Sequence, residues 1–230
     1  MSQLLLFLSS LLVVASVVQR TQADGVQYAV ENKAVGTAGG DRFAKEIGTQ
    51  LSVRAMSSAT KFIWKTFEET SKADRKDIEK VTLIVEVTDV ALAYAIDGAI
   101  HLSEDFIAKY DGDLKTMFIG IIYHEMTHLW QWYGEGAPGG LIEGIADYVR
   151  YVAGYPAPDW AKPGQGDKWD EGYSVTARFL EYCNSLSDGF VAKLNAKMKN
   201  GYSDHLFVEL LGKTVDQLWN DYKSKYSGGH

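Results

Sequence analysis

Residues 124–147 read HEMTHLWQWYGEGAPGGLIEGIAD, and the rest of the chain is best interpreted outward from this stretch. His124 and His128 are four positions apart, so on a helix their imidazoles lie about one turn apart on one face and can reach a single metal ion. Glu125 projects about 100° further round the helix, toward the position that such a metal leaves open. The pattern predicts two metal ligands and a general base.

The residues before this motif favour a buried helix. Residues 117–122 read MFIGII, an apolar run that only Gly120 interrupts. A buried helix that carries two histidines and a glutamate must satisfy these polar side chains, and a metal ion does so. The alternative is a histidine pair that is satisfied within the core without a metal.

A third histidine ligand is absent from the expected place. One class of HExxH protein continues the motif as HExxHxxGxxH, but this chain has Gln131 and Gly134 where that class has the glycine and the last histidine. A second class takes a glutamate from a following helix, with an acid four residues later that hydrogen-bonds a ligand histidine. The sequence excludes the first class and leaves the second.

Glu143 and Asp147 have the spacing of this second class, and the Gly-rich residues 134–140 allow the chain to reverse between two helices. We therefore expect a Zn²⁺ site formed by His124, His128 and Glu143 with one open position. Asp147 is expected to orient a ligand histidine without touching the metal. The alternative is that both acids belong to the solvated edge of an amphipathic helix.

Two motifs resemble a known family. HEMTHLWQWYGEGAPGGLIEGIADYVR at 124–150 and WDEGYSVTARFLEYC at 169–183 are similar to the plant basic secretory protein family, the group called peptidases of plants and bacteria, and the similarity runs from about 28 to 222. The resemblance implies a secreted, zincin-like metallopeptidase with a glutamate third ligand and a role in plant defence. By family analogy, residues 91–100 are expected to form an edge strand along the cleft, where a substrate binds by strand addition.

Other polar residues have weaker signals. Metallopeptidases of this kind commonly use a later Tyr or His to stabilise the oxyanion, and Tyr173, at a predicted helix start in the second motif, is the candidate. Simple packing is the alternative for Tyr173, and His205 is a less favoured donor. His101 follows an alternating strand and is expected to be structural. Cys183, the single cysteine, is expected in the core.

The N-terminus predicts export. Residues 4–18 are apolar and uncharged, and Thr21-Gln22-Ala23 is typical of a cleavage site, so residues 1–23 are predicted to be a signal peptide. No later apolar stretch reaches spanning length, so we expect no membrane anchor and a secreted, extracellular protein, in the apoplast if the source is a plant. The net charge of −7 argues against binding to nucleic acid or anionic surfaces.

The predicted fold class is α+β and zincin-like, with a small mixed sheet, a buried metal-binding helix and a mostly helical C-terminal half. Residues 24–230 are expected to form a single metallopeptidase-like domain, sheet-containing to about 133 and helical from 134 to 230. A monomer is favoured. Strands are predicted at 26–31 and 81–87, and residues 90–96 with 99–102 are expected to form one or two more. Helices are predicted from Asp41 as an N-cap, at 103–110, up to the motif, and at 141–153, 173–186, 188–199, 203–211 and 214–226.

Together these observations predict a secreted zinc-dependent endopeptidase that acts on a peptide or protein substrate. Glu125 would deprotonate a metal-activated water for attack on the scissile carbonyl, and Tyr173 would steady the oxyanion. A non-enzymatic defence protein that binds a pathogen or wall component is the alternative, although a pure binder has no need of Glu125. A zinc hydrolase of non-peptide amides is a second alternative. The sequence does not show which residues bind the side chains of the substrate.

Overall fold

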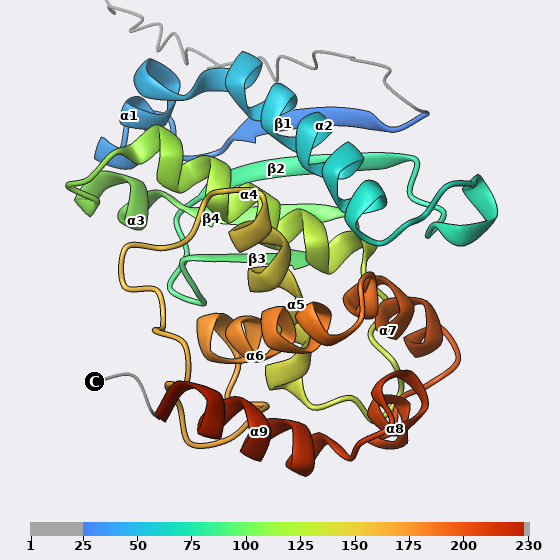
Figure 1. Ribbon diagram of the computed structural model, residues 1–230. Coiled ribbons are helices and arrows are strands. Elements are labelled where there is room, and N and C mark those ends of the chain that lie inside the picture. Colours follow the sequence, from blue (N-terminus) through green and yellow to red (C-terminus); the bar gives the residue numbers. More distant parts are fainter. Residues whose placement is uncertain (1–24, 228–230) are drawn as a thin grey trace, which may run out of the picture.

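The structure, a computed structural model, describes residues 25–227 (Figure 1). The predicted signal peptide, residues 1–23, lies outside this range. The strands are β1 (Gln27–Asn32), β2 (Lys80–Glu86), β3 (Ala93–Ile96) and β4 (Ala99–Ser103). The helices are α1 (Ala38–Glu46), α2 (Gly48–Thr66), the short 3₁₀ helix η1 (Lys72–Asp74), α3 (Glu104–Lys109), α4 (Leu114–Trp130), α5 (Gly139–Val152), α6 (Tyr173–Leu186), α7 (Phe190–Met198), α8 (His205–Leu211) and α9 (Val215–Ser227).

The four strands form a mixed sheet in the order β1-β2-β4-β3. β1, β2 and β4 are parallel, whereas β3 runs antiparallel to β4, and no strand of residues 25–227 pairs with the other edge of β3. Alternate side chains of β2 and β4 enter the core, with Leu83, Val85, Ile100 and Leu102 buried. The predicted α+β class with a small mixed sheet is confirmed.

The prediction that residues 91–100 form one edge strand is wrong. The chain turns at Asp97 and Gly98, which have φ angles of 49° and 75°, so this range contains β3, a tight turn and the start of β4. Two successive positive φ angles are typical of the two-residue turns that join antiparallel strands. Only the four residues of β3 supply the edge.

The first helical region also differs from its prediction. The predicted cap, Asp41, lies inside α1, and Thr37 is the actual N-cap, with its side chain accepting from the backbone N–H of Gly40. Gly39, inside α1, packs directly on the start of α3. A β-carbon at this position would lie 1.9 Å from the Glu104 carbonyl oxygen, so no side chain fits here. α2 begins at Gly48, whose φ of 65° changes the chain direction after α1.

α4 lies at the centre of the molecule. Asp113 caps its start by accepting from the backbone N–H groups of Lys115 and Thr116. α4 contacts α2, β3 and α5, and nearly all of its second half is buried (Figure 1). The polar side chains of the HExxH motif are therefore placed between the sheet and the C-terminal helices.

α5 packs at unusually close range against α6 and the residues just before it, because two glycines of α5 face them. A β-carbon on Gly144 would lie 2.2 Å from Cγ2 of Thr176, and one on Gly140 would lie 1.8 Å from the carbonyl oxygen of Asp170. An aromatic cluster, comprising Trp169, Phe179, Phe207, Trp219 and Tyr222, joins α6 to α8 and α9. Within residues 25–227, no helix has both the length and the apolar character that crossing a membrane requires.

Candidate metal centre and cleft

The two motif histidines converge on one point. His124 and His128 lie one turn apart on α4, both are at least nine-tenths buried, and their Nε2 atoms are 3.1 Å apart. Their rings are nearly perpendicular, at 83°. Two lone pairs can therefore be directed at a single position in front of α4.

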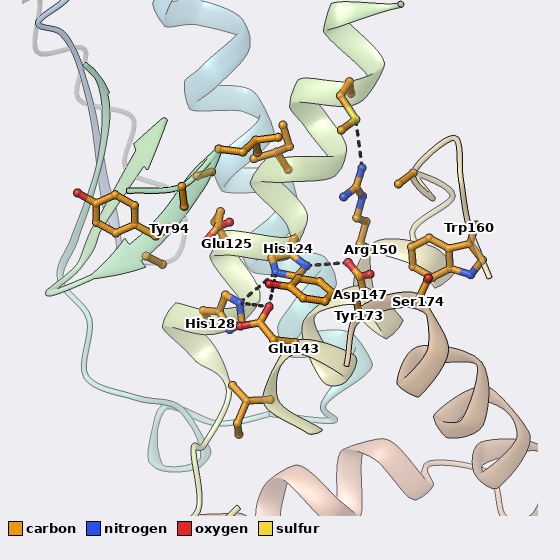
Figure 2. A pocket seen from close by; sticks show the side chains of 18 of the residues that line it. Tyr94, His124, Glu125, His128, Glu143, Asp147, Arg150, Trp160, Tyr173 and Ser174 are labelled. Carbon is orange, nitrogen blue, oxygen red and sulfur yellow. Dashed lines mark hydrogen bonds and ion pairs between the residues drawn. The ribbon is translucent and has the colours of Figure 1, made fainter. Parts of the chain in front are cut away.

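Glu143 completes a three-residue group from the neighbouring helix. Its Oε2 lies 3.1 Å from Nε2 of His124 and 3.4 Å from Nε2 of His128 (Figure 2). A tetrahedral zinc ion with bonds of about 2.0–2.1 Å would hold its ligand atoms about 3.3–3.4 Å apart. The donor types and their spacing fit zinc, and this group is able to hold a metal ion.

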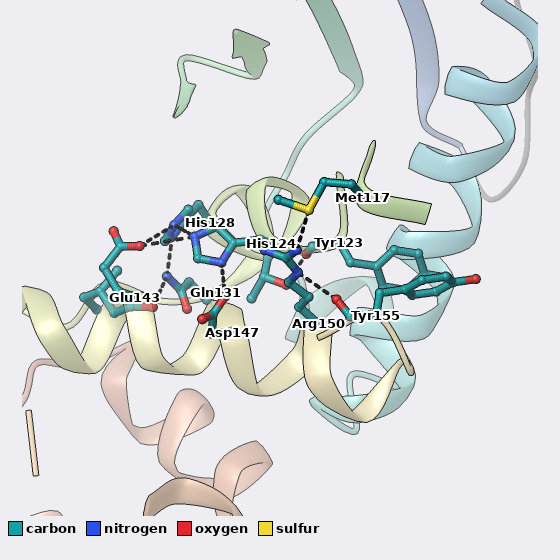
Figure 3. A network of polar contacts seen from close by, with 11 residues as sticks. Met117, Tyr123, His124, His128, Gln131, Glu143, Asp147, Arg150 and Tyr155 are labelled. Carbon is teal, nitrogen blue, oxygen red and sulfur yellow. Dashed lines mark hydrogen bonds and ion pairs between the residues drawn. The ribbon is translucent and has the colours of Figure 1, made fainter. Parts of the chain in front are cut away.

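Each histidine is held through its other ring nitrogen. Nδ1 of His124 lies 2.7 Å from Oδ1 of Asp147, a buried carboxylate one turn beyond Glu143 (Figure 3). Nδ1 of His128 lies 2.9 Å from the side-chain amide of Gln131. The spacing in the sequence predicted that Asp147 orients a histidine, whereas Gln131 was not predicted, although it lies only three residues after His128.

The electrostatics of the group suit a cation. Burial alone would lower the pKa of His124, but hydrogen bonds to Asp147 and Glu143 outweigh burial and raise this pKa to about 9. Burial raises the pKa of Glu143, yet hydrogen bonds from both histidines more than reverse this and hold it well below its usual range. Glu143 therefore stays a carboxylate, and the site strongly favours positive charge.

Glu125 stands beside this group without joining it. Its side chain is buried and lines the cleft, and in Figure 2 it points from α4 toward the side of β3. Burial raises the pKa of Glu125, and the two histidines oppose that rise. A carboxylate with a raised pKa accepts and returns a proton near neutral pH more readily than an exposed one.

Tyr173 is brought over the site by the close packing of α5 and α6. Its ring is stacked on His124, with centroids 6.0 Å apart and an angle of 11° between the planes, and burial and the charge of Glu143 raise the pKa of its hydroxyl. Its φ of 45° is uncommon for a residue with a side chain. Tyr133 also lines the cleft, half-exposed, and the sequence analysis missed it.

The cleft in front of these residues has a volume of about 620 Å³. β3 forms one wall and α5 with the start of α6 forms the other, while α4 forms the floor. At the end near Met117 the lining includes Arg150, Asp159 and Trp160, none of which the sequence analysis connected with the cleft. The side chain of Tyr94 on β3 points away from the histidines (Figure 2).

The remaining candidates lie elsewhere. His101 hydrogen-bonds Glu86 at 2.6 Å and stacks on Tyr94 within the sheet, so its contacts are those expected of a structural residue. His205 is exposed on α8 and does not line the cleft. Cys183 is fully buried, and burial raises the pKa of its thiol, as expected of a core residue.

Comparison with known proteins gives two findings. The family model described as "Peptidase of plants and bacteria" matches residues 23–222. A "Basic secretory protease" from Boswellia serrata is 51% identical over 59 residues, which is 26% of this chain and 67% of that protein.

Proposed function

This chain belongs to the peptidases of plants and bacteria, and we propose that it is a secreted zinc-dependent endopeptidase. One observation carries the proposal: His124, His128 and Glu143 present three donor atoms to one point in a cleft, with Glu125 beside them. Secretion is supported by the name of the Boswellia serrata relative and by the apolar N-terminal run.

His124, His128 and Glu143 would hold the zinc. When bound, zinc would supply Lewis-acid chemistry, polarising a carbonyl oxygen and acidifying water. Asp147 and Gln131 would fix the ring orientation of the two histidines through Nδ1.

Glu125 is proposed as the general base. Its carboxylate would take a proton from the attacking water and pass it to the leaving nitrogen of the scissile amide. Its burial supports this role, because a raised pKa makes the return of the proton easier. Tyr173 would donate a hydrogen bond from its hydroxyl to the carbonyl oxygen as negative charge develops there.

β3 is proposed to bind the substrate backbone. Its outer edge is unpaired and it borders the cleft, so an extended peptide can add to the sheet beside it. Main-chain hydrogen bonds of this kind supply affinity for any sequence, so selection among substrates would depend on the side chains that line the cleft.

The test compares the wild-type chain with Glu125→Gln and a matched control, Glu135→Gln, which changes an exposed glutamate ten residues later. Zinc content is measured by elemental analysis and activity on an unfolded protein. We expect about one zinc per chain in all three proteins and loss of activity only in Glu125→Gln, by about 10²–10⁴-fold. Zinc without activity in the wild type would favour a binding protein or a non-peptide amide substrate. Absence of zinc from all three would contradict the metal site.

A further inference from the structure

Arg150 is a cation that the proposed mechanism does not use. It lies on α5, three residues after Asp147, and only 8% of its surface is exposed, although it lines the cleft. Its Nε donates to the carbonyl oxygen of Tyr155 at 2.8 Å, and its Nη2 contacts the sulfur of Met117 at 3.3 Å (Figure 3). A thioether is a weak acceptor, so this second contact is easily exchanged for a better one.

This guanidinium is incompletely satisfied by the described part of the chain. No described carboxylate forms an ion pair with Arg150, and its Nη1 has no hydrogen-bond acceptor there. Asp147 is engaged by His124, and Asp159, on the cleft rim, is exposed. The charges of Asp147 and Asp159 favour the guanidinium but neither carboxylate contacts it, so a ligand carboxylate can add the direct contact that the described residues do not make.

The position of Arg150 depends on a glycine in the motif helix. A β-carbon on Gly120 would lie 2.9 Å from Nε of Arg150 and 2.9 Å from the carbonyl oxygen of Tyr155. Any other residue at 120 would push the guanidinium off α4. The side chain is therefore held at one end of the cleft, among Met117 and Trp160, rather than swung into solvent.

We propose that Arg150 selects substrates that place a carboxylate at this end of the cleft. The inference rests on the proposed peptidase function. A carboxylate can accept two parallel hydrogen bonds from a guanidinium, including one from the free Nη1. An acidic side chain and a C-terminal carboxylate share this chemistry, and the apolar side chain of Trp160 suits the methylene groups of a glutamate.

The experiment uses a set of quenched fluorescent peptides with a blocked C-terminus. Three positions on each side of the cleaved bond are varied one at a time, and each is made Glu, Gln or Lys. A parallel pair ends in a free carboxylate or an amide at the same positions. We expect kcat/KM to be about tenfold or more higher for Glu than for Gln at one position, with Lys lowest. A preference only for the free C-terminus would assign the carboxylate to the chain end.

Two variants connect the preference to Arg150. In Arg150→Met, the ratio of kcat/KM for the Glu and Gln peptides is expected to fall to about 1, and thermal unfolding checks that the variant is folded. Asp159→Asn changes an exposed residue and does not endanger the core. This variant removes a negative charge that repels the substrate carboxylate, so the ratio of kcat/KM for the Glu and Gln peptides is expected to rise about two- to threefold.

The outcomes separate this inference from the proposed function. If wild-type protein cleaves peptides but treats Glu and Gln alike at every position and at the C-terminus, the inference is overturned and the peptidase remains. An unchanged ratio in a folded Arg150→Met also overturns it. If no peptide is cleaved by wild-type protein, both proposals fail.

Discussion

Oδ1 of Asp147 lies 2.7 Å from Nδ1 of His124, on the side of the ring opposite the nitrogen that faces His128 and Glu143. The two residues come from different helices, α5 and α4, and both are buried. A carboxylate in this place keeps the imidazole proton on Nδ1, which leaves Nε2 free as a donor to a metal.

Replacing Asp147 by Asn is therefore expected to weaken zinc binding about tenfold, because the amide keeps an acceptor for His124 but loses the charge that raises its basicity. Competition with a chromophoric chelator at constant pH measures the affinity. Asp159→Asn is the control, since it removes an exposed acid of the same cleft. Equal affinities in the two variants would contradict the role of Asp147.

Gln131 is expected to do the same for His128. A metal ligand that binds through Nε2 carries its proton on Nδ1 and needs an acceptor there, and the Oε1 atom of Gln131 is buried without a partner among the described residues. Turning the amide by 180° supplies that acceptor, with loss of the hydrogen bond that Nε2 donates to the carbonyl oxygen of Ile142. We expect Gln131→Ala to lower zinc affinity about tenfold and Gln131→Glu to restore it. Failure of the glutamate to rescue would indicate a packing role.

Tyr173→Phe is expected to lower kcat about 10²-fold with little change in KM or zinc content, because a donor to a developing oxyanion acts only in the transition state. Tyr133→Phe is the matched control, as the second tyrosine of the cleft. A loss of kcat confined to Tyr133→Phe would transfer the role to that residue.

The buried carboxyl group of Glu69 makes the free energy of unfolding depend on pH. Neither of its buried carboxylate oxygens has a hydrogen-bond partner in the described structure, and burial raises its pKa from 4.5 to about 7, although Arg75 opposes the rise. Between these values the folded chain holds a proton that the unfolded chain has released, so the free energy of unfolding decreases as the pH rises to about 7.

Glu69→Gln should consequently be more stable than the wild type by about 1–3 kcal/mol at pH 8, and the difference should nearly vanish at pH 4.5. Urea unfolding at the two pH values measures it. Glu68→Gln, an exposed neighbour, is expected to change little at either pH. A stability gain that does not vary with pH would show that Glu69 does not titrate in this range.

The contact between α5 and α6 is expected to tolerate no methyl group. In Gly144→Ala the new carbon would meet Thr176, whose hydroxyl is fixed by the backbone of Trp169 and Gly172 and cannot simply turn away. We expect a loss of about 1–3 kcal/mol in the free energy of unfolding. Gly139→Ala, with nothing within 4 Å, should be neutral or slightly stabilising. Equal stability of Gly144→Ala and Gly139→Ala would contradict the close contact, because both variants gain the same helix propensity.

The sequence predicted those parts of the site that depend on helix periodicity. His124, His128, Glu143 and Asp147 are related in pairs by a spacing of four, and the structure brings all four together. Their roles stay predictions. The predicted boundaries of α6 also agree with the structure, since residues 173–186 are helical throughout.

What the sequence did not predict depends on contacts between distant segments. Arg150 enters the cleft only because Gly120 leaves room for it, and no local pattern connects positions 30 residues apart. The sequence left open one or two strands at 90–96 and 99–102, and only the edge strand expected at 91–100 runs across the turn at Asp97 and Gly98. Here the Asp-Gly pair was a usable signal for a hairpin.

The unpaired edge of β3 lies within a walled cleft rather than on an open surface. A loose, single strand can reach such an edge, whereas another folded sheet or an intact helix is kept out by the walls. As a peptidase, the protein would then cleave only segments that have unfolded locally. Stable proteins, including its own copies, would be spared. The rate of cleavage would depend on how often a segment of the target protein unfolds.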